Sequence, residues 1–320
     1  MAEGTGRVTL WGIEVFAAAA EERSISAAAR RLGASPSAVS QQLSNLEAAL
    51  GVTLIDRSAR PLRMTPAGDL FRSRAQTILN AASQARAELQ SRDLSRLSSL
   101  NLGVIEDFDA DVTPALLSAM ADRLSGARFL LETGASHRLY DLLEAQVLDV
   151  IIAAGPAAPA DWMEVHPLLE EQVVAVVPKG LTQGGDVREV LSRTPMIRYT
   201  TRHVLGRQIS DHLERERLVA PSRFEIDNYH AILAMVAEGK GWSALTPLGI
   251  MRAGRFVDAV DVVPLPVQPM GRRISLVTRA ETFWDMPGEI AGRMRPLLER
   301  LVVAPGRARM PWLGDGLRLL

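Results

Sequence analysis

Apolar residues between positions 10 and 23 recur every three or four residues, which is the spacing of one face of a helix. This pattern predicts a helix over residues 10–23. A second, short helix is expected over residues 27–32, with Ser26 as its N-cap. Gly33 should end it, because glycine readily takes the left-handed backbone conformation found after a helix.

A third helix is predicted directly after Ser35-Pro36, where serine can cap the helix and proline fits its first turn. Two short helices joined by a turn that contains glycine form a helix-turn-helix, whose second helix enters the major groove of DNA. Small hydroxyl and amide groups reach base edges without bulk. The polar face of the third helix carries such groups at Ser37, Ser40, Gln41, Ser44 and Asn45. The alternative is a helical hairpin whose polar face is only solvated.

Two short strands are expected after this helix, over residues 52–56 and 62–65, with a turn over residues 57–61. A two-stranded wing beside a helix-turn-helix suits phosphate binding or entry into the minor groove. The whole chain has a formal net charge of −1, but residues 24–65 carry five arginines against two acids. Three of these arginines lie in the expected wing: Arg57, Arg60 and Arg63.

A long helix is predicted from Thr65-Pro66 to about Ser91. Its apolar residues alternate at spacings of four and three, the pattern of two helices that pack together. Two-fold proteins read palindromic sites, and one helix-turn-helix reads too few base pairs for genomic specificity. We therefore expect a dimer, although packing of this helix onto its own domain is the alternative. The proposed dimer seam is Phe71, Ala75, Ile78, Ala82, Ala85 and Leu89.

Strands and helices alternate after residue 97, which predicts parallel sheets covered by helices. The expected boundaries are a DNA-binding domain over 1–65, a linker helix and hinge over 66–96, and a ligand-binding domain over 97–302. That last domain is long enough for two lobes, one of about 97–160 plus 272–302 and the other of about 161–271. Residues 303–320 lack a clear period and are expected to form an irregular C-terminal tail.

Ligands of open α/β sheets bind beyond the carboxyl ends of the strands. Hydroxyl and amide groups in those loops suit a carboxylate, whereas acids beside aromatic rings suit a cationic or zwitterionic ligand. Four such loops are expected, over residues 106–113, 134–137, 200–203 and 227–230. The acids fall in the first of them, and the alternative is that they cap the helix near Thr113 and face water. The candidate ligand-binding residues are Asp107, Phe108, Asp109, Ser136, Thr200, Asn228 and Tyr229, with Tyr199 as a further aromatic face.

Several classes of protein are excluded or disfavoured. The chain has no cysteine, which excludes disulfides, thiolate metal sites and a cysteine nucleophile. Its five histidines lie singly and no catalytic or nucleotide-binding motif is present, so we expect no enzyme activity, catalytic residue, metal or cofactor. The absence of a signal-peptide pattern and of a long apolar run predicts a cytoplasmic protein without a membrane partner. A cytoplasmic solute-binding or carrier protein is the alternative function.

The first seventy residues resemble the winged helix-turn-helix of LysR-type transcriptional regulators. The resemblance rests on three strings: Ser24-Ile-Ser-Ala-Ala-Ala-Arg-Arg-Leu, Ser35-Pro-Ser-Ala-Val-Ser-Gln-Gln-Leu and Thr65-Pro-Ala-Gly68. It implies groove contacts by Pro36, Ser37, Ser40 and Gln41 and wing contacts by Arg57 and Arg60. The family often has arginine at position 41.

The resemblance also implies an architecture and a set of partners. The fold would be an all-α winged helix-turn-helix with a long linker helix, followed by an α/β two-lobed effector domain like that of periplasmic binding proteins. The resemblance is weaker in that domain, where its anchors are Leu148-Asp149-Val150 and Ala237-Glu-Gly239-Lys-Gly241. The implied partners are palindromic double-stranded DNA, a small-molecule effector, and the chain itself as a homodimer or homotetramer.

Overall fold

The computed structural model describes residues 7–89, 99–122, 124, 126–155, 158–280 and 285–320. Residues 90–96, the last part of the expected linker helix and hinge over 66–96, lie outside this part of the chain. The chain divides into two compact units, one of residues 1–91 with 145–147 and one of residues 92–144 with 148–320. We describe each unit by itself.

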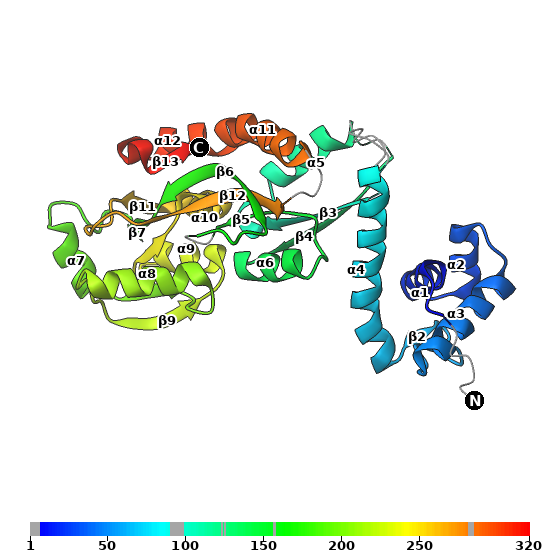
Figure 1. Cartoon of the computed structure of the whole chain (residues 1–320). Coiled ribbons are helices and arrows are strands. Elements are labelled where there is room, and N and C mark those ends of the chain that lie inside the picture. Colours follow the sequence, from blue (N-terminus) through cyan, green and yellow to red (C-terminus); the bar gives the residue numbers. More distant parts are fainter. Residues whose placement is uncertain (1–6, 90–98, 123, 125, 156–157, 281–284) are drawn as a thin grey trace. The chain divides into compact units, whose positions relative to one another are not determined.

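The N-terminal unit contains three helices, a two-stranded wing and a long helix (Figure 1). Helices α1 and α3 bury Phe16, Val39 and Leu43 in one apolar core, as their helical spacing predicted. Strands β1 and β2 pair antiparallel and form the wing. The elements are α1 (Leu10–Glu22), α2 (Ile25–Leu32), α3 (Pro36–Leu50), β1 (Ile55–Asp56), β2 (Arg63–Met64) and α4 (Pro66–Leu89).

The helix starts follow local hydrogen bonding. Ser35 Oγ accepts from Ala38 N at 3.2 Å, and Thr65 Oγ1 accepts from Gly68 N at 3.0 Å, which confirms two expected caps. The expected cap at Ser26 was wrong, because Ser24 Oγ accepts from Ala27 N at 3.3 Å and α2 begins two residues earlier than expected. Both serines have the required side chain, so the pattern alone does not choose between them.

Helix α4 packs its first turns onto its own domain. The rings of Phe71 and Phe16 meet edge to face with centroids 5.1 Å apart, and Ala75 is fully buried in the same core. These two positions of the expected dimer seam therefore pack inside their own domain, which was the alternative to a dimer contact. Ile78 is 39% exposed and Leu70 74% exposed, so apolar surface remains on α4. The side chain of Leu89 lies outside the described residues.

The C-terminal unit has a six-stranded sheet, which we call the first lobe (Figure 1). Helix α11 (Met286–Leu298) packs on β6 and β12, and α6 (Ser136–Glu144) packs on β5 and β3. Helix α5 (Val112–Ala121) contacts α11. The strand order is β13-β6-β12-β5-β3-β4, with β3 (Ser99–Ile105), β4 (Arg128–Gly134), β5 (Val150–Ala154), β6 (Met163–Gln172), β12 (Gly271–Arg279) and β13 (Leu317–Leu319).

The second lobe lies between β6 and β12 in the chain. Its three-stranded sheet has the order β10-β7-β11 and a second sheet pairs β8 with β9. The strands are β7 (Val174–Pro178), β8 (Met196–Tyr199), β9 (Ser222–Ile226), β10 (Ser243–Leu245) and β11 (Val260–Val263). The helices are α7 (Val187–Arg193), α8 (Val204–Arg215), α9 (Tyr229–Ala237) and α10 (Pro247–Arg252).

The sheets differ from the expected parallel arrangement. Strands β3, β4 and β5 are parallel, but β12 runs antiparallel to both β5 and β6, and β7 pairs antiparallel with β10 and β11. The chain returns from the second lobe along β12, so this strand enters the sheet from the opposite end. Since β6 belongs to the six-stranded sheet, the second lobe begins after Gln172 and not near residue 161.

The last eighteen residues are not irregular, in contrast to our expectation. They form α12 (Ala304–Arg309), a 3-10 segment over Pro311–Gly316, and β13, which pairs antiparallel with β6. Leu317 is fully buried and Leu313 nearly so, so this segment completes one edge of the first lobe. Three short elements in succession leave too few residues in each for a periodic pattern.

Candidate nucleic-acid interface and candidate ligand cleft

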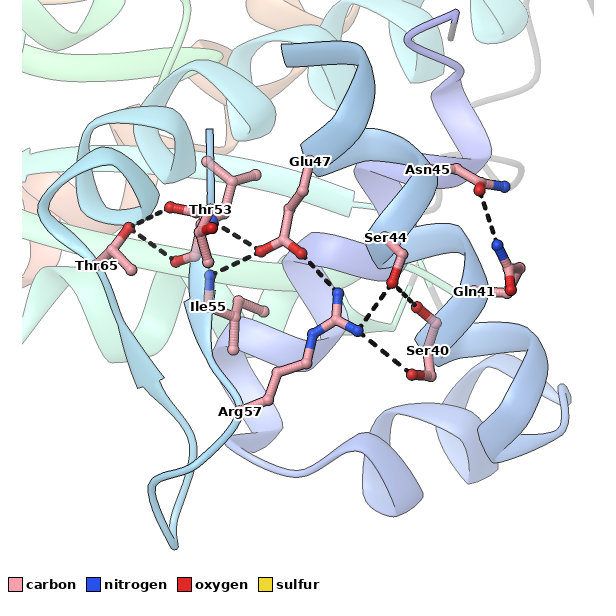
Figure 2. A network of polar contacts seen from close by, with 10 residues as sticks. Ser40, Gln41, Ser44, Asn45, Glu47, Thr53, Ile55, Arg57 and Thr65 are labelled. Carbon is pink, nitrogen blue, oxygen red and sulfur yellow. Dashed lines mark hydrogen bonds and ion pairs between the residues drawn. The ribbon is translucent and has the colours of Figure 1, made fainter. Parts of the chain in front are cut away.

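The polar face of α3 is partly ordered by its own side chains (Figure 2). Gln41 donates from Nε2 to Asn45 Oδ1 at 3.0 Å, and Ser44 donates to the backbone oxygen of Ser40 at 3.1 Å. An amide nitrogen carries two hydrogens, so Gln41 can keep this bond and still offer one N–H and its Oε1 to an adenine. Gln41 is exposed, and so are Pro36 and Ser37 at the start of the helix.

Arg57 joins the wing to α3 (Figure 2). Its guanidinium lies 2.6 Å from Glu47 Oε2 and donates to Ser44 Oγ at 2.9 Å and Ser40 Oγ at 3.5 Å. Several donors of this arginine are therefore engaged within the domain. We expected Arg57 to contact DNA from the wing; the structure places it against α3, the helix whose polar face is expected to enter the groove.

Glu47 is the acceptor at the centre of this network. Its Oε1 also accepts the backbone N–H of Leu54 at 2.8 Å and of Ile55 at 3.1 Å. Its side chain is only 13% exposed, so these hydrogen bonds form in a partly desolvated place. One carboxylate thus fixes both β1 and the guanidinium of Arg57. From the sequence, Glu47 stood out only as one of two acids among the arginines of residues 24–65.

Thr65 and Arg60 complete the wing. Thr65 donates to the backbone oxygens of Thr53 at 2.8 Å and Leu54 at 3.2 Å while it caps α4, so the base of the wing is tied to that helix (Figure 2). Arg60 is exposed and uses Nη1 to reach the backbone oxygens of Arg57 and Ala59. A guanidinium has five N–H donors, which leaves Arg60 donors for a phosphate.

A cleft of about 950 Å³ lies within the C-terminal unit. Both lobes line it, as the placement of loops at the carboxyl ends of strands predicted. The four expected loops contribute Glu106 and Asp107, residues 134–137, His203, and Tyr229. Strands β6 and β12 add Val165, Glu170, Arg272, Arg273 and Ser275.

Three of the seven candidate ligand-binding residues line this cleft, namely Asp107, Ser136 and Tyr229. The other four do not. Phe108 is a buried core residue, and Thr200 is buried and donates to Glu225 at 2.8 Å. Asn228 caps α9 by accepting from Ala231 N at 3.1 Å. Asp109 lies 2.7 Å from the guanidinium of Arg252.

The acids of the 106–111 loop are paired with arginines from distant parts of the chain. Arg252 contacts Asp109 at 2.7 Å and Glu106 at 3.3 Å, and Arg272 contacts Asp107 at 3.1 Å. Asp107 and Asp109 are therefore paired with arginines instead of capping the helix and facing water, as the alternative interpretation had expected. Contact of Asp107 with a ligand stays a prediction. Asp111 precedes α5 but makes no side-chain cap.

Arg272 lies at the floor of the cleft and links three segments. Its Nε donates to Glu171 Oε1 at 2.7 Å, and its Nη2 lies 3.4 Å from Thr246 Oγ1. Glu171 is fully buried and also accepts from Leu248 N at 3.0 Å. Burial raises the pKa of Glu171, and the charge of Arg272 opposes that rise. Arg272 was not predictable as a cleft residue, because nothing in the chain order places it beside residue 107.

The second lobe contributes two tyrosine rings and the imidazole of His203 to the cleft wall, and the first lobe contributes the imidazole of His137. Tyr199 and Tyr229 stack with centroids 5.1 Å apart and planes 10° apart. Tyr199 Oη lies 3.2 Å from His203 Nδ1, and the rings of His203 and His137 have centroids 6.2 Å apart. Burial, followed by the neighbouring His137, lowers the pKa of His203. Both histidines had been interpreted as solitary.

The sequence matches two family models that together cover most of its length. Residues 10–69 match the bacterial regulatory helix-turn-helix protein, lysR family, and residues 95–283 match the LysR substrate binding domain. This chain belongs to the LysR family of transcriptional regulators. As a LysR-family protein it is a DNA-binding regulator and not an enzyme, so the carrier alternative falls.

Relatives of this LysR-family regulator include two mycobacterial proteins described as "Probable hydrogen peroxide-inducible genes activator". The protein of Mycobacterium avium is 29% identical over 307 residues, which cover 93% of this chain and 97% of that one. The protein of Mycobacterium xenopi is 33% identical over 188 residues, which cover 59% of this chain and 99% of that one.

Solved structures share the fold of the LysR-family chain. OxyR of Corynebacterium glutamicum, as a C206 mutant, has a TM-score of 0.63 at 23% identity, and 97% of each chain is covered. Full-length CbnR complexed with its target DNA has a TM-score of 0.58 at 20% identity, with 90% of this chain and 100% of that one covered. They confirm the expected winged helix-turn-helix followed by an α/β ligand-binding domain.

Two further observations concern membranes and metals. None of the helices that the structure describes is long and apolar enough to cross a lipid bilayer. Within the same described residues, no three or more His, Asp or Glu side chains gather as they would to hold a metal ion.

Proposed function

We propose that this LysR-family regulator binds a palindromic operator as a homodimer, with the polar face of α3 reading base edges. The observation that carries the proposal is the network of Glu47, Arg57, Ser44 and Ser40, which holds this face and the wing in one fixed arrangement. A reading surface fixed in this way loses little side-chain freedom on binding.

The groove and wing residues take different roles in this proposal. Gln41 and Ser40 contact base edges. Pro36 and Ser37, at the start of α3, approach the sugar-phosphate backbone of the DNA, and Arg60 binds a phosphate from the wing. Arg57 acts mainly as a positioning residue, because its guanidinium is already bound to Glu47 and Ser44.

The dimer would form through the exposed part of α4. Phe71 and Ala75 are used in the domain core, so the proposed contact involves Ile78 and continues through Ala82, Ala85 and Leu89. Pairing of the C-terminal domains into a tetramer is a further part of the proposal. The edge strand β4 exposes Leu130 and Leu131, which supports a contact there.

The cleft between the lobes would take a small-molecule effector. Asp107, Ser136 and Tyr229 are proposed to contact it, with Phe108, Asp109, Thr200 and Asn228 holding the surrounding loops. The names of the mycobacterial relatives describe activators of genes that hydrogen peroxide induces, but this sequence contains no cysteine. A reaction of peroxide with a thiolate is therefore not available to these 320 residues, and the proposed effector binds non-covalently.

The DNA assignment is tested by comparing Gln41→Ala with Arg60→Ala. Gln41→Ala should narrow the affinity gap between operator and random duplex by roughly tenfold, because one base contact is lost. Arg60→Ala should lower the affinity for operator and for random duplex alike. It should also flatten the slope of log K against log salt by up to ~0.9. Fluorescence anisotropy over a salt series measures both, with Arg193→Ala, an exposed arginine of α7, as the control. Wild-type behaviour in both variants would remove this face from the interface.

A further inference from the structure

The residues that line the cleft leave it negatively charged. Four carboxylates lie on its wall, from Glu106, Asp107, Glu144 and Glu170, against two guanidinium groups, from Arg272 and Arg273. Without the two imidazoles, the formal charges of these groups sum to −2. A concave site lined by one sign of charge concentrates ligands of the opposite sign. An anionic ligand is disfavoured here on charge alone.

The buried arginine of the cleft is already paired with protein carboxylates. The side chain of Arg272 is only 9% exposed and contacts both Glu171 and Asp107. A ligand carboxylate at Arg272 would have to displace one of these partners and leave a buried protein carboxylate without its cation, which is costly. Arg272 therefore does not form a ready site for an acid. Arg273 lies 3.8 Å from Glu170, and its side chain is 57% exposed.

Two buried polar atoms of the cleft lining lack hydrogen bonds. Asp107 is 6% exposed, and its Oδ1 lies 3.1 Å from Arg272 Nη2 but makes no hydrogen bond. The hydroxyl of Tyr140 is buried and has no partner either. An ionised carboxylate only accepts hydrogen bonds, whereas an ammonium or guanidinium only donates them. A cationic donor thus supplies the hydrogen bond that Asp107 Oδ1 lacks, and Tyr140 Oη is a second acceptor in the lining of the same cleft.

Aromatic surface lies in the same cleft. The stacked rings of Tyr199 and Tyr229 line it from the second lobe, and Trp162 lines it from the first. The face of an aromatic ring attracts a cation, and its apolar area favours a hydrocarbon body. The acceptor without a hydrogen bond, the negative formal charge and the aromatic wall therefore all favour a cationic ligand with an apolar body.

We propose that the effector of this regulator is an organic cation, a primary amine or guanidine on an apolar body, whose N–H groups bind Asp107 at the floor of the cleft. The proposal rests on the proposed function of the cleft as the effector site. The sequence interpretation had the same class of ligand contact Asp107, Phe108 and Asp109. In the present proposal Asp107 is a buried acceptor that is paired with an arginine, and Phe108 and Asp109 do not contact the ligand.

The test uses three probes that share a ring and differ in charge: benzylamine, benzyl alcohol and benzoate. Each is added to the full chain at matched millimolar concentration, and binding is measured by thermal shift and calorimetry, because a ligand of the native state raises Tm. We expect benzylamine to bind more tightly than benzyl alcohol and benzoate to bind weakest. Asp107→Asn should weaken benzylamine roughly tenfold or more, as loss of a charged hydrogen bond does.

Two further variants separate binding from folding. Asp111→Asn changes an exposed acid of the same loop that does not line the cleft, and should leave benzylamine binding unchanged. Tyr140→Phe removes a buried hydroxyl without a partner, so it should weaken benzylamine while the Tm of the free protein stays the same or rises.

The outcomes distinguish the ligand class from the site. Benzoate that binds as well as benzylamine, with no effect of Asp107→Asn, would overturn the cationic class and leave the cleft as an effector site. Failure of all three compounds to bind the full chain would overturn both the ligand class and the proposed role of the cleft.

Discussion

At the scale of single residues, Glu47 has the most consequences for function. It accepts two backbone N–H groups of the wing and pairs with Arg57, which in turn holds Ser44 and Ser40 on α3. The exposed polar residues of α3 could be predicted from helical spacing. The hydrogen bonds of Glu47 could not, because they depend on how the strand after α3 folds back against it.

We expect Glu47→Gln and Glu47→Ala to separate these two roles. Glutamine keeps an oxygen for the N–H groups of Leu54 and Ile55 but loses the ion pair with Arg57, which should cost roughly 1–2 kcal/mol. Both variants should lose operator affinity, whereas only Glu47→Ala should speed hydrogen exchange at Leu54 and Ile55. Hydrogen exchange is measured by mass spectrometry, and operator affinity by fluorescence anisotropy. Normal operator affinity of Glu47→Gln would show that Arg57 needs no positioning.

The ligand cleft shows the same limit on sequence reasoning. The loops that carry Asp107, Ser136 and Tyr229 could be placed at strand ends, and the structure brings them to one cleft. The partners of the acids, Arg252 and Arg272, come from far along the chain. An acid in a loop has the same pattern whether it faces water or a buried guanidinium, so its partner in the fold was not predictable.

At the scale of elements, helices and their caps were the most predictable features, because N-caps depend on residues within one turn. Strand β6 was missed since it contains Pro167 and several charged residues. In the structure its pairing with β12 shifts register between Ile274 and Ser275, opposite Leu168. A bulge tolerates a proline inside a sheet, which a regular ladder does not. Whether a strand pairs parallel or antiparallel is likewise not visible in the residue pattern of that single strand.

Helix α4 carries the prediction that belongs to this scale. Ile78→Asp places a charge on an exposed apolar position, so the monomer should stay folded while the dimer loses roughly tenfold or more in affinity. Ser73→Asp, on another face of the same helix and exposed, is the matched control. Analytical ultracentrifugation measures both. If Ile78→Asp associates like the control, the dimer contact lies elsewhere.

At the scale of the whole molecule, the family and the order of its parts could be predicted, because the helix-turn-helix is encoded in one continuous segment. The lobe boundary and the C-terminal strand could not, since both depend on which strands share a sheet. The chain thus joins two compact units: one in which Glu47 holds the wing to α3, and one in which Arg272 holds three segments beside the cleft.

The central claim is that this chain reads a two-fold symmetric DNA sequence with α3. Selection of duplexes from a random pool by the full chain tests it most directly. We expect the recovered sequences to share two inverted half-sites whose centres lie about one helical turn of DNA apart or a multiple of it. Gln41→Ala should relax the recovered half-site at one base position. Recovery of sequences without a shared half-site, or of the same half-site by Gln41→Ala, would contradict the account.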